Sequence, residues 1–125
     1  MGTLDQFIKQ QYINLETFRK NGASLKTPVW FVQEGQTLYV LTMANSGKVK
    51  RIRNNARINV TPCKMDGTPS GTWMPANAME ICDPEVLKKI DRLLDKKYGL
   101  MKKIFSLRAA RQASQDTILA IQLIE

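Results

Sequence analysis

The sequence predicts a small, mainly β protein in which six mostly antiparallel strands close into a barrel that carries short accessory helices. Three observations support this. Short β-prone runs recur along the chain with turn residues between them, as in antiparallel barrels. No crossover helix separates the first three runs, which excludes a parallel arrangement there. At 125 residues, the chain 1–125 forms a single domain with one core.

The first part of the chain predicts a short amphipathic helix over residues 3–10, followed by three strands. These strands are expected at residues 12–18, 25–33 and 37–42. Asn21-Gly22 lies between the first two, and this pair favours a tight hairpin turn. Because tight turns join all three, we expect them to form an antiparallel meander.

The middle of the chain predicts a second helix from Ser46 to about Asn55. Its apolar stripe consists of Val49, Ile52 and Ala56, and Lys50 and Arg51 are expected to face outward. Two further strands follow, at residues 57–61, with alternating inward side chains, and at about 71–81.

Asp83-Pro84 marks the start of the longest predicted helix, with aspartate as N-cap and proline at the first helical position. Apolar residues follow at helical spacing as far as Tyr98, and Gly99 is the expected stop. A short helix around residues 101–105 is expected next. The last strand, 117–124, is apolar almost throughout, which indicates burial on both faces, inside the barrel or under a dimer partner.

The composition excludes several classes of function. The chain has no histidine, so Ser-His-Asp and Cys-His catalytic groups and histidine-ligated metal sites cannot form, and we expect no metal site. It has only 11 acidic residues, so general acid–base hydrolysis is not expected. Any chemistry is therefore expected to come from a bound cofactor, and no catalytic side chain is assigned.

The net charge of +8 predicts an anionic partner: nucleic acid, a membrane surface or a phosphorylated ligand. The alternative is a solvated lysine-rich surface. No apolar run reaches the roughly 20 residues of a membrane span, and the N-terminus lacks a secretory pattern. Cys63 and Cys82 lie far apart in the sequence, and reduced thiols in a cytoplasmic protein are the expectation.

The segment Thr42–Asn55 is the strongest candidate for a site. It leaves an apolar strand and opens a helix whose first turn contains Ser46, Gly47 and Lys48, with Arg51 following. Free backbone N–H groups and the helix dipole favour an anion at such a position. The hydroxyl can donate, the glycine allows close approach, and the cations add full charges. We interpret this segment as a phosphate site for a flavin-like cofactor.

Prolines in or beside three predicted strands are a second clue, at Pro28, Pro62 and Pro75. Proline cannot donate a ladder hydrogen bond, so it marks an edge, a strand end or a bulge. One interpretation is protection against edge-to-edge aggregation. The other is a break where a flavin ring lies against the sheet, with Val29, Trp30, Phe31 and Trp73 as candidate ring contacts; a core role for each tryptophan is the alternative.

With Thr27-Pro28-Val29-Trp30-Phe31, the strand at 37–41 and Ser46-Gly47-Lys48 placed, the chain resembles the pyridoxamine 5′-phosphate oxidase-like split β-barrel proteins. It is most similar to their small flavin- or deazaflavin-dependent oxidoreductase branch. The resemblance covers residues 12–81 and the last strand. It implies a six-stranded antiparallel split barrel of the FMN-binding type, and a homodimer with cofactor sites at the interface.

The resemblance also implies roles for individual residues. Thr42, Ser46 and Lys48 match the phosphate-binding positions. Gly47 stands where the oxidases carry arginine, and Lys50 or Arg51 is the candidate replacement. The ring-lining set comprises Thr27, Pro28, Val29 and Trp30, with Pro62 and Cys63 ending the strand beside it and Thr72 and Trp73 reaching the site from the second subunit.

The expected function is an FMN-dependent, or alternatively deazaflavin (F420-type)-dependent, oxidoreductase that transfers hydride to or from a small hydrophobic or conjugated substrate. Lys50, Arg51, Arg53 and Arg57 would suit the acidic tail of the deazaflavin. Pyridoxamine phosphate oxidation itself is not expected, since the chain has no histidine and lacks the oxidases' C-terminal extension. The alternatives are a non-catalytic flavin-binding or storage module and a basic nucleic-acid-binding protein, although the aromatic residues are not interleaved with the cations.

Overall fold

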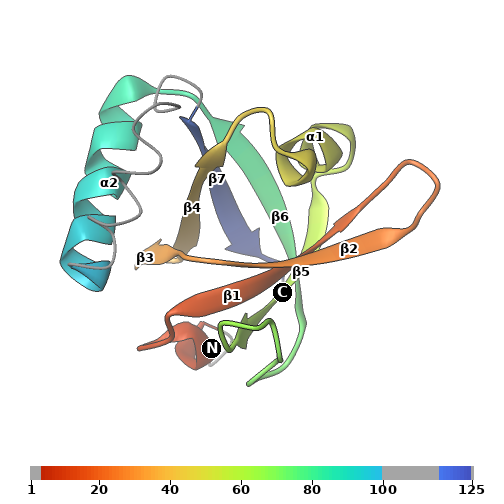
Figure 1. Cartoon of the computed structure of the whole chain (residues 1–125), viewed down its shortest axis with the longest axis horizontal. Helices are drawn as coiled ribbons and strands as arrows, with labels where there is room; N and C mark the ends of the chain where they lie inside the picture. The colour runs from red at the N-terminus through yellow and green to blue at the C-terminus, as the bar shows by residue number, and fades with distance from the viewer. Residues whose placement is uncertain (1–3, 100–115, 125) are drawn as a thin grey trace.

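The computed structural model describes residues 4–99 and 116–124, and its main feature is one antiparallel sheet of seven strands that curls into a half-barrel (Figure 1). The order across the sheet is β2-β1-β5-β6-β7-β4-β3. The strands are β1 (Tyr12–Phe18), β2 (Ser24–Val29), β3 (Val32–Glu34), β4 (Thr37–Met43), β5 (Arg57–Cys63), β6 (Met74–Ile81) and β7 (Asp116–Leu123). The predicted mainly β barrel with accessory helices is confirmed.

In the described part of the chain, three helical segments accompany the sheet. The 3-10 helix η1 (Asp5–Phe7) replaces the longer helix predicted over 3–10. The helix α1 (Gly47–Asn54) agrees with the prediction, except that Ala56 lies beyond its end and is exposed. The helix α2 (Pro84–Tyr98) begins as predicted, because the Asp83 side chain accepts a hydrogen bond from the Glu85 N–H at 2.9 Å. The helix predicted around 101–105 lies outside the described residues.

The strand predicted over 25–33 is wrong as one element. It is broken at Trp30 and Phe31, so that β2 and β3 lie at opposite edges of the sheet. The predicted meander is therefore also wrong, and two separate hairpins, β1–β2 and β3–β4, take its place. The Tyr98 hydroxyl causes the break: it accepts from the Phe31 N–H at 3.0 Å and lies 2.9 Å from the Phe31 carbonyl, the groups that a ladder would use.

The strand β6 starts later than predicted, because Gly71, Thr72 and Trp73 belong to the preceding loop. The Gln6 side chain binds both backbone groups of Thr72, donating to its carbonyl and accepting from its N–H, each at 2.9 Å. These groups are thereby withdrawn from the ladder, and pairing with β5 begins only at Met74.

The core has two parts. The inward rows of the strands fill the barrel, and Phe7 of η1 and Val49 and Ile52 of α1 pack against these rows. The helix α2 packs on the outer face, against a cluster that includes Leu41, Ile81 and Ile118. This explains the predicted double-sided burial of β7: its inward side chains lie in the barrel, and Ile118 on its other face lies under α2.

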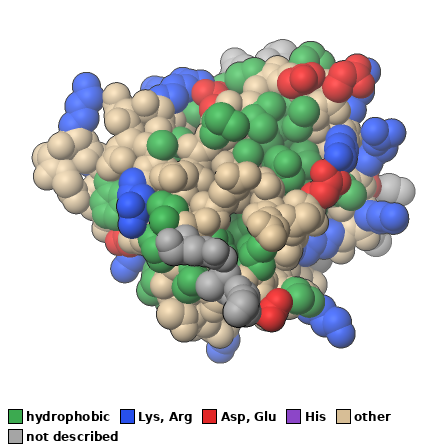
Figure 2. All heavy atoms as spheres, turned by 180° about the vertical axis from the view of Figure 1, so that it is seen from behind, with side chains coloured by type: hydrophobic (Ala, Val, Ile, Leu, Met, Phe, Trp, Pro, Cys, Tyr) green, Lys and Arg blue, Asp and Glu red, His purple; other side chains and the backbone are tan. Residues whose placement is uncertain are grey.

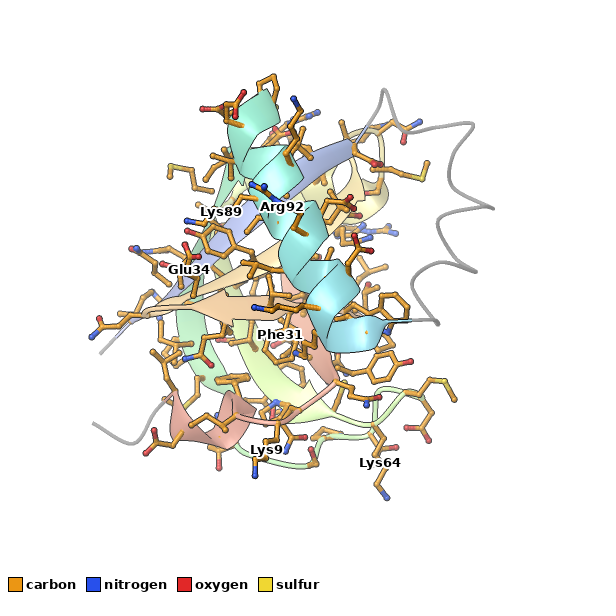
Figure 3. All side chains as sticks on the ribbon, turned by 90° about the vertical axis from the view of Figure 1, so that its left-hand side faces the viewer. Lys9, Phe31, Glu34, Lys64, Lys89 and Arg92 are labelled. Carbon is orange, nitrogen blue, oxygen red and sulfur yellow. The ribbon has the colours of Figure 1, made fainter. Side chains whose placement is uncertain are left out.

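The break between β2 and β3 is fastened to the last turn of α2 (Figure 3). The Lys97 ammonium donates to the Phe31 carbonyl at 2.8 Å and lies 3.5 Å from the centre of the Phe31 ring. Trp30 stacks on Tyr98, with ring centroids 4.3 Å apart. Further along, Lys89 of α2 pairs with Glu34 of β3 at 2.6 Å.

The far side of the molecule carries hydrophobic side chains near the middle of the face, whereas lysines and arginines project mainly around its rim (Figure 2). Met79 of β6 is one of the few large hydrophobic residues exposed in the described part of the chain, at 64% exposure.

Cys63 and Cys82 are both free thiols. Within residues 4–99 and 116–124, no helix is long and apolar enough to cross a membrane.

Candidate functional site

The corner where β4 passes into α1 is the centre of the candidate site. The Ser46 N–H donates to the Met43 carbonyl at 3.0 Å, and the Ser46 carbonyl accepts from the Lys50 N–H at 3.2 Å, so Ser46 is the N-cap of α1. Val49 and Ile52 are buried on the barrel side of the helix. This packing fixes the first turn of α1 at one end of the barrel, with its free N–H groups at the corner.

The Ser46 hydroxyl makes no capping bond, although that is the usual role of an N-cap serine. Its oxygen is buried and has no hydrogen-bond partner among the described residues. A buried polar atom without a partner is costly, and it is uncommon in folded proteins. The hydroxyl is therefore available for a group that the chain itself does not supply.

Arg51 faces the corner, so the prediction that it faces outward is wrong. Its Nε donates to the Thr17 hydroxyl of β1 at 2.7 Å. Its terminal Nη1 lies over Gly47, only 2.8 Å from the position that a Cβ on that glycine would take. Lys50 is exposed, as predicted.

The corner is strongly cationic. Burial, and secondly the charge of Arg51, lowers the pKa of Lys48. Burial, and secondly the charge of Arg19, lowers the pKa of Arg51. No ion pair joins any of these three cations to a carboxylate within the described part of the chain. Like charges gathered without a counter-ion raise the free energy of the protein, and a bound anion would lower it.

Arg53, two residues further along α1, shows the contrast. Its guanidinium binds both carboxylate oxygens of Glu80, at 2.7 and 2.8 Å. This hydrogen bonding is the main cause that lowers the pKa of Glu80 to about 2. Glu80 therefore neutralises the charge of Arg53, whereas no described carboxylate pairs with Arg51.

Thr42 lies near the end of β4, opposite Thr117 of β7. It continues the inward row of Leu38 and Val40, and it directly precedes the turn into α1. The structure thus brings Thr42, Ser46, Gly47, Lys48 and Arg51 into one region, as the sequence predicted for them.

The predicted ring-lining residues form a second region, at the other end of β1. Thr27, Pro28 and Val29 lie on the edge strand β2, opposite Leu15, Asn14 and Ile13. Pro62 and Cys63 end β5, opposite Ile13 and Tyr12. Since the register places Thr17 four residues from Ile13, the two regions lie about 14 Å apart along β1.

The loop before β6 folds over this second region. The Asn14 side-chain amide donates to the Gly67 carbonyl at 2.8 Å, and a Cβ on Gly67 would come within 3.8 Å of the Pro28 ring. Trp73 is half-buried, with the Lys26 ammonium 5.5 Å from the centre of its ring. Thr72 is exposed and held by Gln6.

Trp30 and Cys63, two of the predicted ring-lining residues, are packed within the chain itself. Trp30 stacks on Tyr98, which satisfies the core alternative considered for it. Cys63 is buried, and burial raises the pKa of its thiol to about 11, so the thiol is protonated at neutral pH.

Sequence reasoning missed Thr17, Arg19 and Asn14. Thr17 and Arg19 reach the corner from the β1–β2 hairpin, far from α1 in the sequence, and only the strand order brings them there. Asn14 has a buried side-chain oxygen without a hydrogen-bond partner in the described structure. A polar residue in the inward-facing register of an apolar strand, as at Thr17, is the one signal that could have found any of them.

The donors at the corner suit anion binding. No group of three or more cysteine, aspartate or glutamate side chains gathers at one point among residues 4–99 and 116–124. The corner supplies a hydroxyl, backbone N–H groups and cations, which are the donors that hold phosphate groups in proteins.

Comparison with solved structures identifies the fold. A Listeria innocua protein described as a candidate pyridoxamine 5′-phosphate oxidase superposes with a TM-score of 0.72, at 14% identity over 98% of this chain and 90% of that one. An F420 reductase gives 0.67, at 15% identity over 100% and 95% of the two chains. The heme storage protein HutZ from Vibrio cholerae gives 0.73, at 13% identity over 97% and 87%.

These identities are low, and the likeness establishes the fold. No protein-family model matches the sequence, and no curated protein matches it. The three structural relatives differ in what their descriptions say of them, so the split barrel serves several purposes.

Proposed function

We propose that this chain, which has the split-barrel fold of the pyridoxamine 5′-phosphate oxidase-like proteins, binds a phosphorylated flavin cofactor and works as an oxidoreductase. One observation carries the proposal. The cations Lys48, Arg51 and Arg19 gather beside a buried Ser46 hydroxyl that lacks a partner, and no described carboxylate pairs with them. A phosphate group relieves both the charge repulsion and the unmade hydrogen bond.

Each residue of the corner has a role in holding the phosphate. Lys48 and Arg51 supply positive charge, and the Ser46 hydroxyl and the first N–H groups of α1 donate hydrogen bonds. Gly47 leaves room for Arg51 to lie over the first turn. Thr42 closes the corner on the side of β4.

The flavin ring belongs on the outside of the barrel, because apolar side chains fill the interior. Within the described residues, the edge strand β2 pairs with a strand on one side only, so its backbone around Thr27–Val29 can hydrogen-bond the polar edge of a ring. Pro62 and Cys63 flank this stretch, and Thr72 and Trp73 of a second copy would cover the ring. We therefore propose a homodimer with two cofactor sites at its interface.

The bound cofactor would supply hydride transfer to or from a small hydrophobic or conjugated substrate. The protein would anchor the phosphate, fix one face of the ring and leave the other face to the substrate. No side chain of the chain is assigned a covalent or proton-transfer role.

FMN is the cofactor that we propose, and an F420-type deazaflavin is the alternative. The acidic tail of the deazaflavin needs uncompensated cations beyond the phosphate. Of the four cations considered for this tail, Arg53 is neutralised by Glu80 and Arg51 is bound to Thr17 at the corner, which leaves the exposed Lys50 and Arg57.

A flavin-binding module without turnover is a second candidate. The sequence has no histidine, and among the described residues no carboxylate pairs with the cations of the corner. The site therefore offers no obvious proton donor beside a ring, which favours binding without turnover. Steady-state reduction of the bound flavin by nicotinamide nucleotides, in the presence of quinone or nitroaromatic acceptors, distinguishes an enzyme from a storage protein.

The test of cofactor binding compares two lysines of α1. Lys48 is half-buried at the corner and Lys50 is exposed on the same helix, so Lys48→Met and Lys50→Met remove the same charge from different places. We expect Lys48→Met to weaken FMN binding by about tenfold or more, because hydrogen bonds to charged groups contribute roughly 1.5–3 kcal/mol. Lys50→Met is expected to change it less than threefold.

Calorimetric titrations with FMN, F420 and riboflavin give the affinities, and absorption spectra with mass spectrometry identify any cofactor that copurifies. Riboflavin, which lacks the phosphate, should bind both variants equally. Equal losses of FMN affinity in both variants would contradict the corner as the phosphate site. Failure of the unaltered protein to bind either phosphorylated cofactor would contradict the proposed function.

A further inference from the structure

The guanidinium of Arg51 lies between Thr17 and Gly47. On one side its Nε donates to the Thr17 hydroxyl at 2.7 Å. On the other side its Nη1 lies over Gly47, in the space that any larger residue there would need. Because Nε is hydrogen-bonded to Thr17 and Gly47 has no side chain, the terminal amino groups lie over the first turn of α1.

Thr17 is out of place by the usual rules of burial. It is 1% exposed and lies in the inward row of β1, in line with the apolar Ile13 and Leu15. A buried hydroxyl costs free energy unless it is hydrogen-bonded. In the described structure its hydroxyl bonds to one side chain, that of Arg51. This bond explains why threonine occupies the position.

The kind of partner matters as much as its position. Glu80 binds Arg53 with two carboxylate oxygens and neutralises its charge. Thr17 accepts one hydrogen bond and carries no charge. A hydroxyl therefore fixes the direction of Arg51 and leaves its positive charge available to a ligand.

We propose that Thr17 is a positioning residue for anion binding: its hydroxyl aims the terminal amino groups of Arg51 at the phosphate corner beside Ser46 and Gly47. This inference rests on the proposed function, because the anion that Arg51 meets is the phosphate proposed above. It adds the β1–β2 hairpin to a site that the sequence places wholly on β4 and α1.

The test uses two substitutions at Thr17. Thr17→Val has nearly the same shape but no acceptor, and valine is common in strands and in buried positions, so the variant is expected to fold. Thr17→Ser keeps the hydroxyl. We expect Thr17→Val to weaken FMN and inorganic phosphate binding by about tenfold, and Thr17→Ser to stay within about threefold of the unaltered protein.

Two readouts separate positioning from a general effect on structure. Riboflavin affinity, which does not involve the phosphate, should be the same in all three proteins. In ¹H–¹⁵N spectra without ligand, the Nε–H signal of Arg51 should be resolved in the unaltered protein and in Thr17→Ser, and should move to the position of free arginine in Thr17→Val.

The outcomes are distinct. If Thr17→Val binds FMN and phosphate as tightly as the unaltered protein does, the inference is overturned and the proposed function stands. If the unaltered protein binds no flavin, the proposed function fails. Inorganic phosphate then decides the inference: a loss confined to Thr17→Val supports it, and equal affinity, or no phosphate binding at all, overturns it.

Discussion

Arg51 and Arg53 lie two positions apart on α1 and face different surroundings. Arg53 pairs with a carboxylate, whereas Arg51 meets a neutral hydroxyl and the open space over a glycine. The sequence predicts Arg53 at the border of the apolar stripe and Arg51 facing outward, because helical periodicity indicates a face and cannot predict which partner a side chain meets there. Ser46, Gly47 and Lys48 could be predicted as a group, since the helix start places them together locally.

Gly47 gives a prediction at this scale. Alanine favours helices over glycine by up to about 1 kcal/mol, so Gly47→Ala should leave the fold intact or slightly more stable. Its methyl group would meet Nη1 of Arg51, which must then move. We expect thermal stability to hold or rise while FMN affinity falls several-fold. Calorimetry and titration on one preparation check both; unchanged affinity would show that Arg51 adjusts freely.

Lys97 predicts a pH dependence of stability. Burial lowers the pKa of this lysine to about 8 in the folded protein, whereas an unfolded lysine titrates near 10.4. Between these values the unfolded chain binds more protons than the folded one, so the free energy of unfolding rises with pH. The buried Cys63 thiol, whose pKa is raised to about 11, acts in the opposite direction above the pKa of an unfolded thiol. Urea unfolding at pH 7.5 and 9.5 should therefore show the Lys97 contribution as a difference between the unaltered protein and a variant without this lysine.

Lys97→Met is the control for that experiment, because it removes the titrating group and keeps the apolar stem. The variant should show a smaller gain between the two pH values. Measurements stay below pH 10, because burial raises the pKa of Tyr98 and ionisation of unfolded tyrosine would begin to oppose the trend. Parallel curves for both proteins would mean that Lys97 is fully solvated.

At the level of elements, α2 determines where the second predicted strand breaks. The run Val29-Trp30-Phe31 favours a strand, and Pro28 before it indicates an edge or a bulge without showing that the strand ends at Trp30. The cause is Tyr98, far away in the sequence, whose hydroxyl takes up the backbone groups of Phe31. Tertiary contacts of this kind override local preference and cannot be read from a local pattern.

Tyr98→Phe tests that contact. The substitution keeps the stack on Trp30 but leaves the Phe31 N–H and the Gln11 carbonyl, now 2.7 Å from the hydroxyl, without their partner. Unpaired buried groups cost roughly 1–3 kcal/mol each, so we expect a loss of stability of that order in urea unfolding. Tyr39→Phe, in the same cluster, has no described hydroxyl bond and should be nearly neutral.

At the scale of the whole molecule, a filled barrel directs any large ligand to its outer surface. The fold class, the positions of most strands and the end of the barrel that carries α1 could be predicted, because alternation and turn residues specify them. The order of the strands across the sheet could not be predicted, because it depends on pairings between distant segments. Thr17 and Asn14 reach the candidate site only through such pairings.

The assembly is predicted at this scale too. We expect light scattering after gel filtration to give about twice the chain mass of 14.2 kDa. Met79 of β6 is a large hydrophobic residue that is 64% exposed, so a charge there should weaken a dimer whose interface covers it. Met79→Glu is compared with Ile8→Glu, which places the same charge on η1's flank. A monomeric unaltered protein contradicts the homodimer.

The two residues between β2 and β3 set the circumference of the barrel. One continuous segment supplies both outer strands of the sheet, so its length fixes how far the sheet must wrap before its two ends meet. The exposed hairpin tip at Asn21 and Gly22 carries no strand pairing, so added residues there would leave the order of the sheet unchanged. An extra residue beside Trp30 would instead shift the pairing of one outer strand, so this short link should tolerate an insertion less well than the hairpin tip does.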